Sequence, residues 1–351
     1  MNLYNAIQTY DTEDYRQFLT GLPQQIENGY NTIVSENIKP KKNLTSIVIS
    51  GMGGSAIGGE LVQSLYSSKL SIPLIIVRDY TLPAFVGSQT LVIVSSYSGE
   101  TEESLAVYNQ AQKAHSTIVC ITSGGSLKNF AKRDNIPIVN LPGKYQPRAA
   151  VGVSFIGIVR VLEQFQLIGF QSSDVAETVS TLRELKAQYD IKNVHHSEPY
   201  HVAQQLLEKI PLIYTGPAPF SALGTRWKCQ FNENAKIPAF CNSLPEMNHN
   251  EIVGWNKAFS LTPHLYVVFL RDAGEPESIQ HRIEITQKII RSQNGNYTEV
   301  WSSGKSILSR VFSLLYFGDY TSYYAALLYK TNPTSIDNIT YLKKQMKKFN
   351  L

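Results

Sequence analysis

Short apolar runs alternate with longer amphipathic segments along most of this chain. In the first half the apolar runs lie at 46–50, 73–77, 91–94, 117–121 and 137–139, and most are dominated by valine and isoleucine. Helical patterns follow at 56–66 and 102–113, and a long apolar helix is predicted from about 148 to 167. Nearly continuous apolar strands separated by helices are typical of a parallel sheet covered on both faces. The first half therefore predicts a doubly wound α/β domain.

The same order restarts after a polar helical stretch at 171–193. An apolar run at 211–215 enters a Gly-Pro loop, and a helix is predicted at 220–233. Strands at 265–270 and 298–301 and helical patterns at 278–292 and 306–329 complete a second α/β unit. We therefore predict an α/β chain with two doubly wound, flavodoxin-like parallel sheets. The predicted divisions are an N-terminal helical segment (1–40), a first domain (41–168), a helical linker (169–193) and a second domain (194–351).

Composition and charge exclude several classes of protein. The chain has 351 residues, 43% of them hydrophobic, which is enough for packed cores and excludes wholesale disorder. A net charge of +4, concentrated near the C-terminus, argues against a nucleic-acid partner. No uncharged apolar run approaches the roughly 18 residues that a membrane span needs, and no signal peptide is visible. Three cysteines without a CxxC pair (Cys120, Cys229 and Cys241) predict a reduced protein of the cytoplasm.

A glycine-rich loop, Gly51-Met52-Gly53-Gly54-Ser55, follows the first predicted strand directly. Backbone amides at such a strand-to-helix turn are well placed to bind an anion. The spacing Gly51-x-Gly53-x-x-Ala56, with Asp79 farther along, also satisfies the dinucleotide fingerprint. A nicotinamide-dependent oxidoreductase and a tight turn without a ligand therefore stay open as alternatives at this point.

A second loop, after the third predicted strand, is rich in hydroxyl groups. Ser96, Ser98 and Thr101 surround Gly99 where a helix begins. One hydroxyl could be an ordinary helix cap, but three at this spacing favour a ligand. Hydroxyls and backbone amides together suit a phosphate monoester. Because the first and third strands are expected to be neighbours at the switch point of the sheet, both loops should face one crevice.

The residues of this second loop, Ser96-x-Ser98-Gly99-x-Thr101, resemble the signature of the sugar isomerase (SIS) fold, whose members bind phosphosugars. From Gly51 to about Lys344 the chain resembles the bifunctional phosphoglucose/phosphomannose isomerases of bacteria and archaea. Further motifs carry the resemblance: Gly51-Met52-Gly53-Gly54-Ser55, Pro147-Arg148-Ala149-Ala150, Asn232-Glu233-Asn234 and Asn248-His249-Asn250-Glu251. The resemblance implies an aldose–ketose isomerase that interconverts glucose 6-phosphate and mannose 6-phosphate with fructose 6-phosphate through a cis-enediol.

The resemblance also assigns roles to individual residues. Glu233 is the expected base at carbon 2, where a weak carbon acid calls for a carboxylate with a tuned pKa. His249 is expected to open the sugar ring, since histidine exchanges protons near neutral pH. Arg148 is expected to stabilise the enediolate charge, and Lys343 to enter the site, with Lys344 as the open alternative. The residues expected to hold the phosphate are Gly54, Ser55, Ser96, Ser98 and Thr101.

The resemblance further implies an obligate homodimer, because the relatives take the ring-opening histidine from the neighbouring subunit. A small hydroxyl residue, Thr334 or Thr340, is implied to admit the 2-epimer. No cofactor and no metal are expected, since the clustered His195, His196 and His201 lack metal-ligand spacing. The main alternative is a non-catalytic SIS regulator that binds sugar phosphates. Such regulators normally carry an appended DNA-binding or partner domain, and the residues before the first strand do not resemble a helix-turn-helix head.

Overall fold

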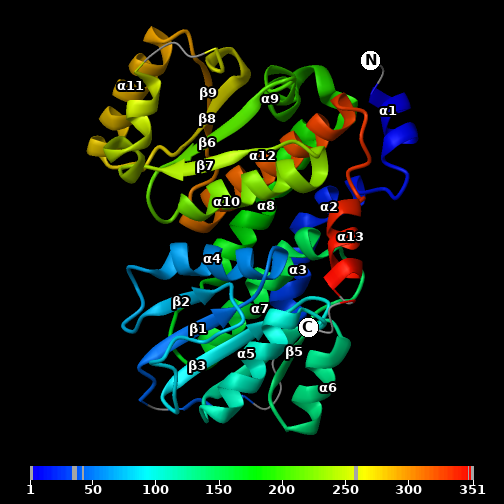
Figure 1. The fold of residues 1–351 in the computed structure, drawn as a ribbon, viewed down its shortest axis with the longest axis vertical. Helices are drawn as coiled ribbons and strands as arrows, with labels where there is room; N and C mark the ends of the chain where they lie inside the picture. The colour runs from blue at the N-terminus through cyan, green and yellow to red at the C-terminus, as the bar shows by residue number, and fades with distance from the viewer. Residues whose placement is uncertain (1–2, 34–37, 42, 257–259, 347, 349–351) are drawn as a thin grey trace.

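Each half of the chain builds its own parallel β-sheet, and the two sheets lie at opposite ends of the molecule (Figure 1). The computed structural model describes residues 3–33, 38–41, 43–256, 260–346 and 348. The first sheet has the order β2-β1-β3-β4-β5, and all its strands are parallel. Its strands are β1 (Ser46–Ser50), β2 (Leu74–Val77), β3 (Thr90–Ser95), β4 (Thr117–Thr122) and β5 (Ile138–Asn140). This flavodoxin-like order confirms the predicted doubly wound sheet.

Helices cover both faces of the first sheet because successive strand residues point to opposite sides. Ile47 and Ile49 belong to the core that includes α4 (Gly54–Tyr66) and α7 (Val151–Gln164). Val48 and Val92 belong to a separate core, shared with α5 (Glu102–Lys113) and α6 (Gly125–Arg133). The period of two along each strand thus separates two apolar layers. α6 coincides with no element predicted from the sequence.

The second sheet has the order β7-β6-β8-β9, again with all strands parallel. Its strands are β6 (Ile210–Thr215), β7 (Phe240–Ser243), β8 (Leu265–Arg271) and β9 (Asn296–Trp301). Its helices are α9 (Glu198–Gln205), α10 (Ser221–Gln230), α11 (Glu277–Ser292) and α12 (Ile307–Leu328). The edge strand β7 was not predicted, because its four residues include no run of buried aliphatic side chains and Phe240 is largely exposed.

A layer of helices joins the two halves. The stretch predicted as a linker forms α8 (Ser172–Tyr189), which packs against α12 and against α3 (Leu22–Thr32). Almost every residue of α12 is buried, as expected for a helix that is apolar on all sides. The N-terminal segment contributes α1 (Leu3–Tyr10) and α2 (Arg16–Thr20), which contact α12. Tyr323 on α12 donates a 2.8 Å hydrogen bond to the Asp11 carboxylate, which ties this segment to the core.

The last helix, α13 (Asp337–Met346), lies on the outside of the molecule (Figure 1). None of its described residues is buried, and Tyr341 and Leu342 are more than half exposed. Among the described helices, none is long and apolar enough to cross a membrane.

Candidate active site

The loops after β1 and β3 lie side by side at the switch point of the first sheet. Ser50 and Val94 are paired in the β1–β3 register, which confirms the predicted neighbours. A Cβ atom on Gly51 would lie 2.9 Å from the carbonyl oxygen of Ser95. The backbones of the two loops therefore approach each other as closely as glycine allows. The Ser55 hydroxyl accepts a 3.0 Å hydrogen bond from the backbone N–H of Tyr97. The two loops therefore form one crevice wall.

The three hydroxyls of the second loop all make hydrogen bonds within the loop, and two of them bond to each other. Ser96 donates a 3.0 Å hydrogen bond to the Thr101 hydroxyl and accepts a 3.1 Å bond from the Gly99 N–H. Ser98 accepts a 3.3 Å bond from the N–H of Glu100. Thr101 occupies the N-cap position of α5, but its side chain makes no capping hydrogen bond. Helix capping therefore does not account for these hydroxyls.

The first loop also packs directly on the backbone that carries Arg148. A Cβ atom on Gly54 would lie 2.4 Å from the carbonyl oxygen of Pro147 and 2.8 Å from the nitrogen of Arg148. No side chain fits that gap, so glycine is needed for the close approach. The short 3-10 helix η1 (Pro147–Ala149) is thereby held against the start of α4. This contact places the predicted phosphate loop and the predicted arginine in one site.

The guanidinium of Arg148 is buried, with 3% of the residue exposed, and most of its hydrogens are already committed. It lies 5.0 Å from the ring centroid of Tyr15. Burial raises the pKa of Tyr15, so its phenol stays neutral beside the cation. Four of the five N–H groups of an arginine find acceptors here. The acceptors are Asn234 Oδ1 (2.9 Å), Gln146 Oε1 (2.9 Å), the Pro333 carbonyl (2.6 Å) and the Thr334 carbonyl (3.0 Å).

The remaining hydrogen of Arg148 is on Nη1, which lies 3.6 Å from Oε2 of Glu233. This contact joins the two halves of the chain, because Arg148 follows the first sheet and Glu233 follows β6 and α10. The Glu233 side chain is about one quarter exposed and lines a cavity of about 390 Å³. The structure thus brings Glu233, Arg148 and the first predicted phosphate loop together.

Glu233 lies in a π-helical turn, and this differs from the regular helix predicted at 220–233. α10 ends at Gln230, and the π-helical turn η3 (Phe231–Ala235) continues it with hydrogen bonds between residues five apart. The neighbouring Asn234 is fully buried, accepts from Arg148 and donates a 3.0 Å hydrogen bond to Ser322. Single π turns are frequent at functional sites, because they change the direction of a side chain without ending the helix.

A buried ion pair between Arg226 and Asp319 holds the backbone of Arg148, and it was not predicted from the sequence. Arg226 on α10 donates a 2.8 Å hydrogen bond to the Arg148 carbonyl. Its Nε and Nη2 atoms bind both carboxylate oxygens of Asp319, at 2.9 and 2.7 Å. The signal in the sequence was Asp319 itself, a carboxylate in the middle of an apolar helix, where an unpaired charge is too costly to bury.

Comparison with known proteins assigns the family. A model described as bacterial phospho-glucose isomerase C-terminal SIS domain matches residues 195–346. A bifunctional phosphoglucose/phosphomannose isomerase of Caldicellulosiruptor bescii is 39% identical over 332 residues, which cover 93% of this chain and 96% of that relative. This chain belongs to the bifunctional phosphoglucose/phosphomannose isomerase family.

Two further proteins are similar to this chain. A D-glucosamine-6-phosphate 4-epimerase of Sulfolobus acidocaldarius is 33% identical over 224 residues, covering 64% of this chain and 68% of the epimerase. The structure of a hypothetical protein from Thermus thermophilus matches with a TM-score of 0.71 and 15% identity, over 94% of this chain and 89% of that protein. At that identity the second match shows the fold alone, and it agrees with the two parallel sheets.

Of the other residues that the family resemblance singled out, Thr334 lies beside Arg148, whereas His249 and the two lysines are exposed. His249 ends the short helix η4 (Glu246–His249) after β7 and is exposed. In the part of the chain that the structure describes, no hydrogen bond or ion pair joins it to Glu233. Lys343 and Lys344 are both exposed on α13, as is Thr340. Thr334 is buried beside Arg148, and its hydroxyl has no hydrogen-bond partner among the described residues.

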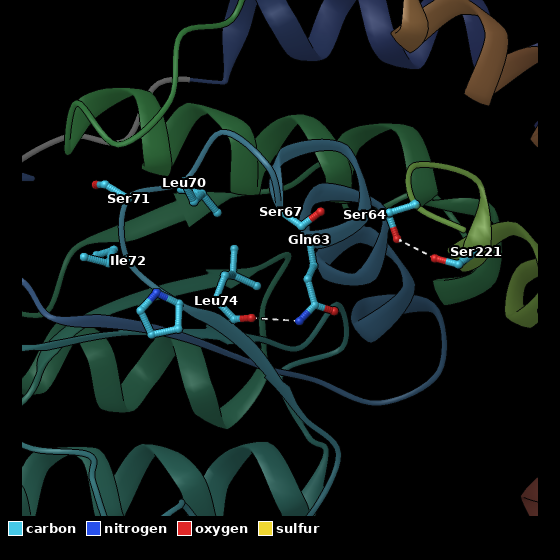
Figure 2. Close-up of a pocket in the computed structure, with 10 residues that line it drawn as sticks. Gln63, Ser64, Ser67, Leu70, Ser71, Ile72, Leu74 and Ser221 are labelled. Atoms are coloured by element: carbon cyan, nitrogen blue, oxygen red, sulfur yellow. Dashed lines mark hydrogen bonds between the residues drawn. The ribbon is translucent and has the colours of Figure 1, made fainter. Parts of the chain in front are cut away.

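A second cavity, of about 450 Å³, lies where α4 meets the second half of the chain (Figure 2). Figure 2 shows the hydroxyl of Ser64 on α4 facing that of Ser221 on α10, and the two are hydrogen-bonded at 3.3 Å. None of the residues that line this cavity is charged, and none is a predicted site residue. The cavity therefore belongs to the junction between the halves. Within the described ranges, no group of three or more His, Cys, Asp and Glu side chains is placed to hold a metal ion.

Proposed function

We propose that this protein interconverts glucose 6-phosphate and mannose 6-phosphate with fructose 6-phosphate through a cis-enediol, without a metal or cofactor. The observation that carries the proposal is that Arg148 links the two halves of the chain. Its Nη1 atom lies against Glu233, and its backbone packs against the Gly54 loop. The family supports an isomerase over a non-catalytic sugar-phosphate regulator. The proposed site needs both predicted domains, because the phosphate loops lie within 41–168 and Glu233 within 194–351.

In the proposed reaction the phosphate is held by the paired loops at the switch point. The amides around Gly54 and the hydroxyls of Ser55, Ser96, Ser98 and Thr101 would supply the donors. These groups are neutral, so they hold the phosphate without a strong positive field near the reacting carbons. The phosphate thus anchors one end of the open-chain sugar and leaves carbons 1 and 2 to reach towards Glu233.

Glu233 would take the proton from carbon 2 and return it to carbon 1. The negative charge that develops on the enediolate oxygens would be stabilised by the one Nη1 hydrogen of Arg148 that no protein acceptor binds closely. Glucose and mannose configurations give the same enediol, since they differ only in the face of carbon 2 that carries the proton. A single carboxylate can therefore serve both sugars when the carbon 1–carbon 2 segment is free to rotate.

His249 would open the sugar ring in a site completed by a second copy of the chain. Two observations support a second copy: the His249 side chain is exposed, and no described contact links it to Glu233 of its own chain. The proposed functional unit is therefore a homodimer with composite active sites. Lys343 is proposed to reach the same site from α13, and Thr334 to leave room for the 2-epimer.

The test is conversion of each hexose 6-phosphate to fructose 6-phosphate in the presence of a chelator. Glucosamine 6-phosphate is tested in parallel, because one similar protein is a 4-epimerase of that sugar. Turnover of both hexose phosphates is expected. Binding without turnover of any of these sugars would support the regulator instead, and turnover of glucosamine 6-phosphate alone would support an epimerase.

Glu233→Gln tests the base. It keeps the size of the side chain but removes the proton acceptor, so exchange of the carbon 2 proton with solvent should disappear while sugar-phosphate binding stays. Glu184→Gln, on an exposed face of α8, is the matched control and should behave as wild type. Isomerisation that survives in Glu233→Gln would remove Glu233 from the role of base.

A further inference from the structure

Lys236 directly follows the π turn that carries Glu233 and folds back onto it. Its backbone is left-handed, with φ of 59°, which turns the side chain towards the turn that it terminates. Its ammonium group donates hydrogen bonds to the carbonyl oxygens of Glu233 (2.6 Å), Asn234 (3.2 Å) and Asn332 (2.7 Å). The side chain also lines the cavity into which Glu233 opens.

These three hydrogen bonds use every hydrogen that a lysine ammonium has. Two of them hold the turn that carries Glu233, and the third holds Asn332. The carbonyls of the next two residues, Pro333 and Thr334, accept from Nη2 of Arg148. Lys236 therefore joins the segment that presents the carboxylate to the segment that fixes the guanidinium. It has no hydrogen left for a substrate, so it does not act by direct contact.

We propose that Lys236 is a positioning residue, whose ammonium locks the Glu233 turn to residues 332–334 so that the carboxylate and Arg148 keep their relative places. This proposal rests on the proposed isomerase function. A neutral amine has two hydrogens and one lone pair, so it cannot donate to three carbonyls. Loss of the proton should therefore loosen one of the three contacts and move the base.

The charges around Lys236 come from three elements. Arg148 of η1 disfavours the ammonium, while Asp337 of α13 and Glu233 of the π turn favour it. Burial and then Arg148 dominate, and they lower the pKa of Lys236 to about 8. The ammonium is thus present at neutral pH and is lost as the pH rises through about 8. We expect kcat to fall along that alkaline limb.

The test compares Lys236→Met and Lys236→Arg with a matched control, Lys330→Met. Lys330 also has a left-handed backbone, with φ of 56°, and is exposed. Its side chain makes no hydrogen bond or ion pair with any described residue, so its replacement reproduces the backbone effect alone. Because a misplacement of about 1 Å can cost about 100-fold in rate, Lys236→Met should lower kcat by about that factor with little change in KM.

Lys236→Arg keeps a cation that does not titrate in this range. It should restore part of kcat and remove the alkaline limb near pH 8, and Lys330→Met should keep both wild-type values. The proposal is wrong if the limb persists in Lys236→Arg. It is equally wrong if Lys236→Met loses thermal stability but the folded variant keeps its kcat, since that result describes a purely structural residue.

A second measurement does not depend on activity. Hydrogen exchange of the backbone amides at 231–237, at neutral pH, should be faster in Lys236→Met than in wild type and unchanged in Lys330→Met. If wild type does not turn over any hexose phosphate, the proposed function fails, and exchange in this turn still decides whether Lys236 holds it. Unchanged exchange in Lys236→Met would overturn the proposal even in an active enzyme.

Discussion

At the scale of single residues, Arg148 is an arginine whose surroundings a lysine could not satisfy. Four acceptors lie in different directions around its planar guanidinium, and a lysine ammonium has only three hydrogens on one atom. We expect Arg148→Lys to lower kcat/KM by about 10²–10³-fold, as the loss of one transition-state donor typically does. Arg160→Lys is the control in steady-state kinetics, because Arg160 also lies against a tyrosine ring but away from the site. Equal kinetics of the two variants would contradict the role of Arg148.

Gly54 gives a second prediction at this scale. In Gly54→Ala the new methyl group would lie 2.4 Å from the Pro147 carbonyl, so η1 and Arg148 must shift. Overpacking of this kind costs about 1–3 kcal/mol. We expect a lower free energy of unfolding in denaturant titration together with weaker catalysis. Gly87→Ala is the control, because nothing lies within 4 Å of its added methyl group. A Gly54→Ala variant as stable and active as Gly87→Ala would contradict this packing.

The sequence predicted the residue types of the site better than their contacts. The paired loops could be predicted because each follows an apolar strand, and parallel strands present such loops on one edge. The contact of Gly54 with Pro147 joins positions far apart in the chain, and no periodicity reports it. Lys236 was missed for the same reason. Its proposed role depends on the backbone carbonyls of Asn332, Glu233 and Asn234, and every residue type has a backbone carbonyl, so the sequence does not single these out.

At the scale of elements, α10 and α12 are joined by the buried ion pair of Arg226 with Asp319, and the site rests on it. Asp319→Asn leaves the Arg226 cation without its counter-charge in the interior. Breaking a buried pair in this way costs about 3–5 kcal/mol, which should appear as a lower midpoint in urea. The control is Glu27→Gln, which breaks the largely exposed pair with Arg183 and should cost about 1 kcal/mol or less. A similar loss of unfolding free energy in both variants would show that the buried pair stabilises the fold no more than the exposed pair does.

The elements that were not predicted from the sequence are all short. α6 begins at Gly125, directly after another glycine, and its nine residues give a shorter pattern than the twelve of α5. β7 is an edge strand of four residues, none of them buried, so it lacks the apolar run of a buried strand. The π turn after α10 was predicted as ordinary helix, because hydrophobic period alone does not distinguish the two over five residues.

At the scale of the whole molecule, two similar sheets carry different chemistry in the loops at their switch points, and the phosphate site is proposed in the first half only. In the first half the loops at the switch point carry hydroxyls and glycines. In the second half the loop after β8 carries Asp272 and Glu275, which are buried and paired with Arg310 and Arg271. Carboxylates there repel a phosphate, and their pairing with these arginines leaves neither cation free to attract it. The second half instead supplies Glu233, so in the proposed site one half binds the phosphate and the other provides the base.

The proposed composite site makes a prediction that only the assembled molecule can answer. Glu233→Gln and His249→Ala should each be inactive, because each dimer then lacks the base or the ring-opening acid in both sites. In a mixed dimer one site carries both substitutions and the other carries neither. After unfolding and refolding of an equal mixture, half of the dimers are mixed and half of their sites are intact, so about a quarter of the wild-type activity should return.

Two controls make that result decisive. Glu233→Gln mixed with the double variant Glu233→Gln/His249→Ala should recover nothing, because no pairing restores a base. Sedimentation equilibrium of differently tagged chains reports whether mixed dimers have formed, so that the activity can be related to their fraction. Mixed dimers without recovered activity would place Glu233 and His249 of one chain in the same site, and a purely monomeric protein would exclude the composite site. Recovery in proportion to the mixed fraction would mean that the exposed His249 acts on a sugar bound by the partner chain.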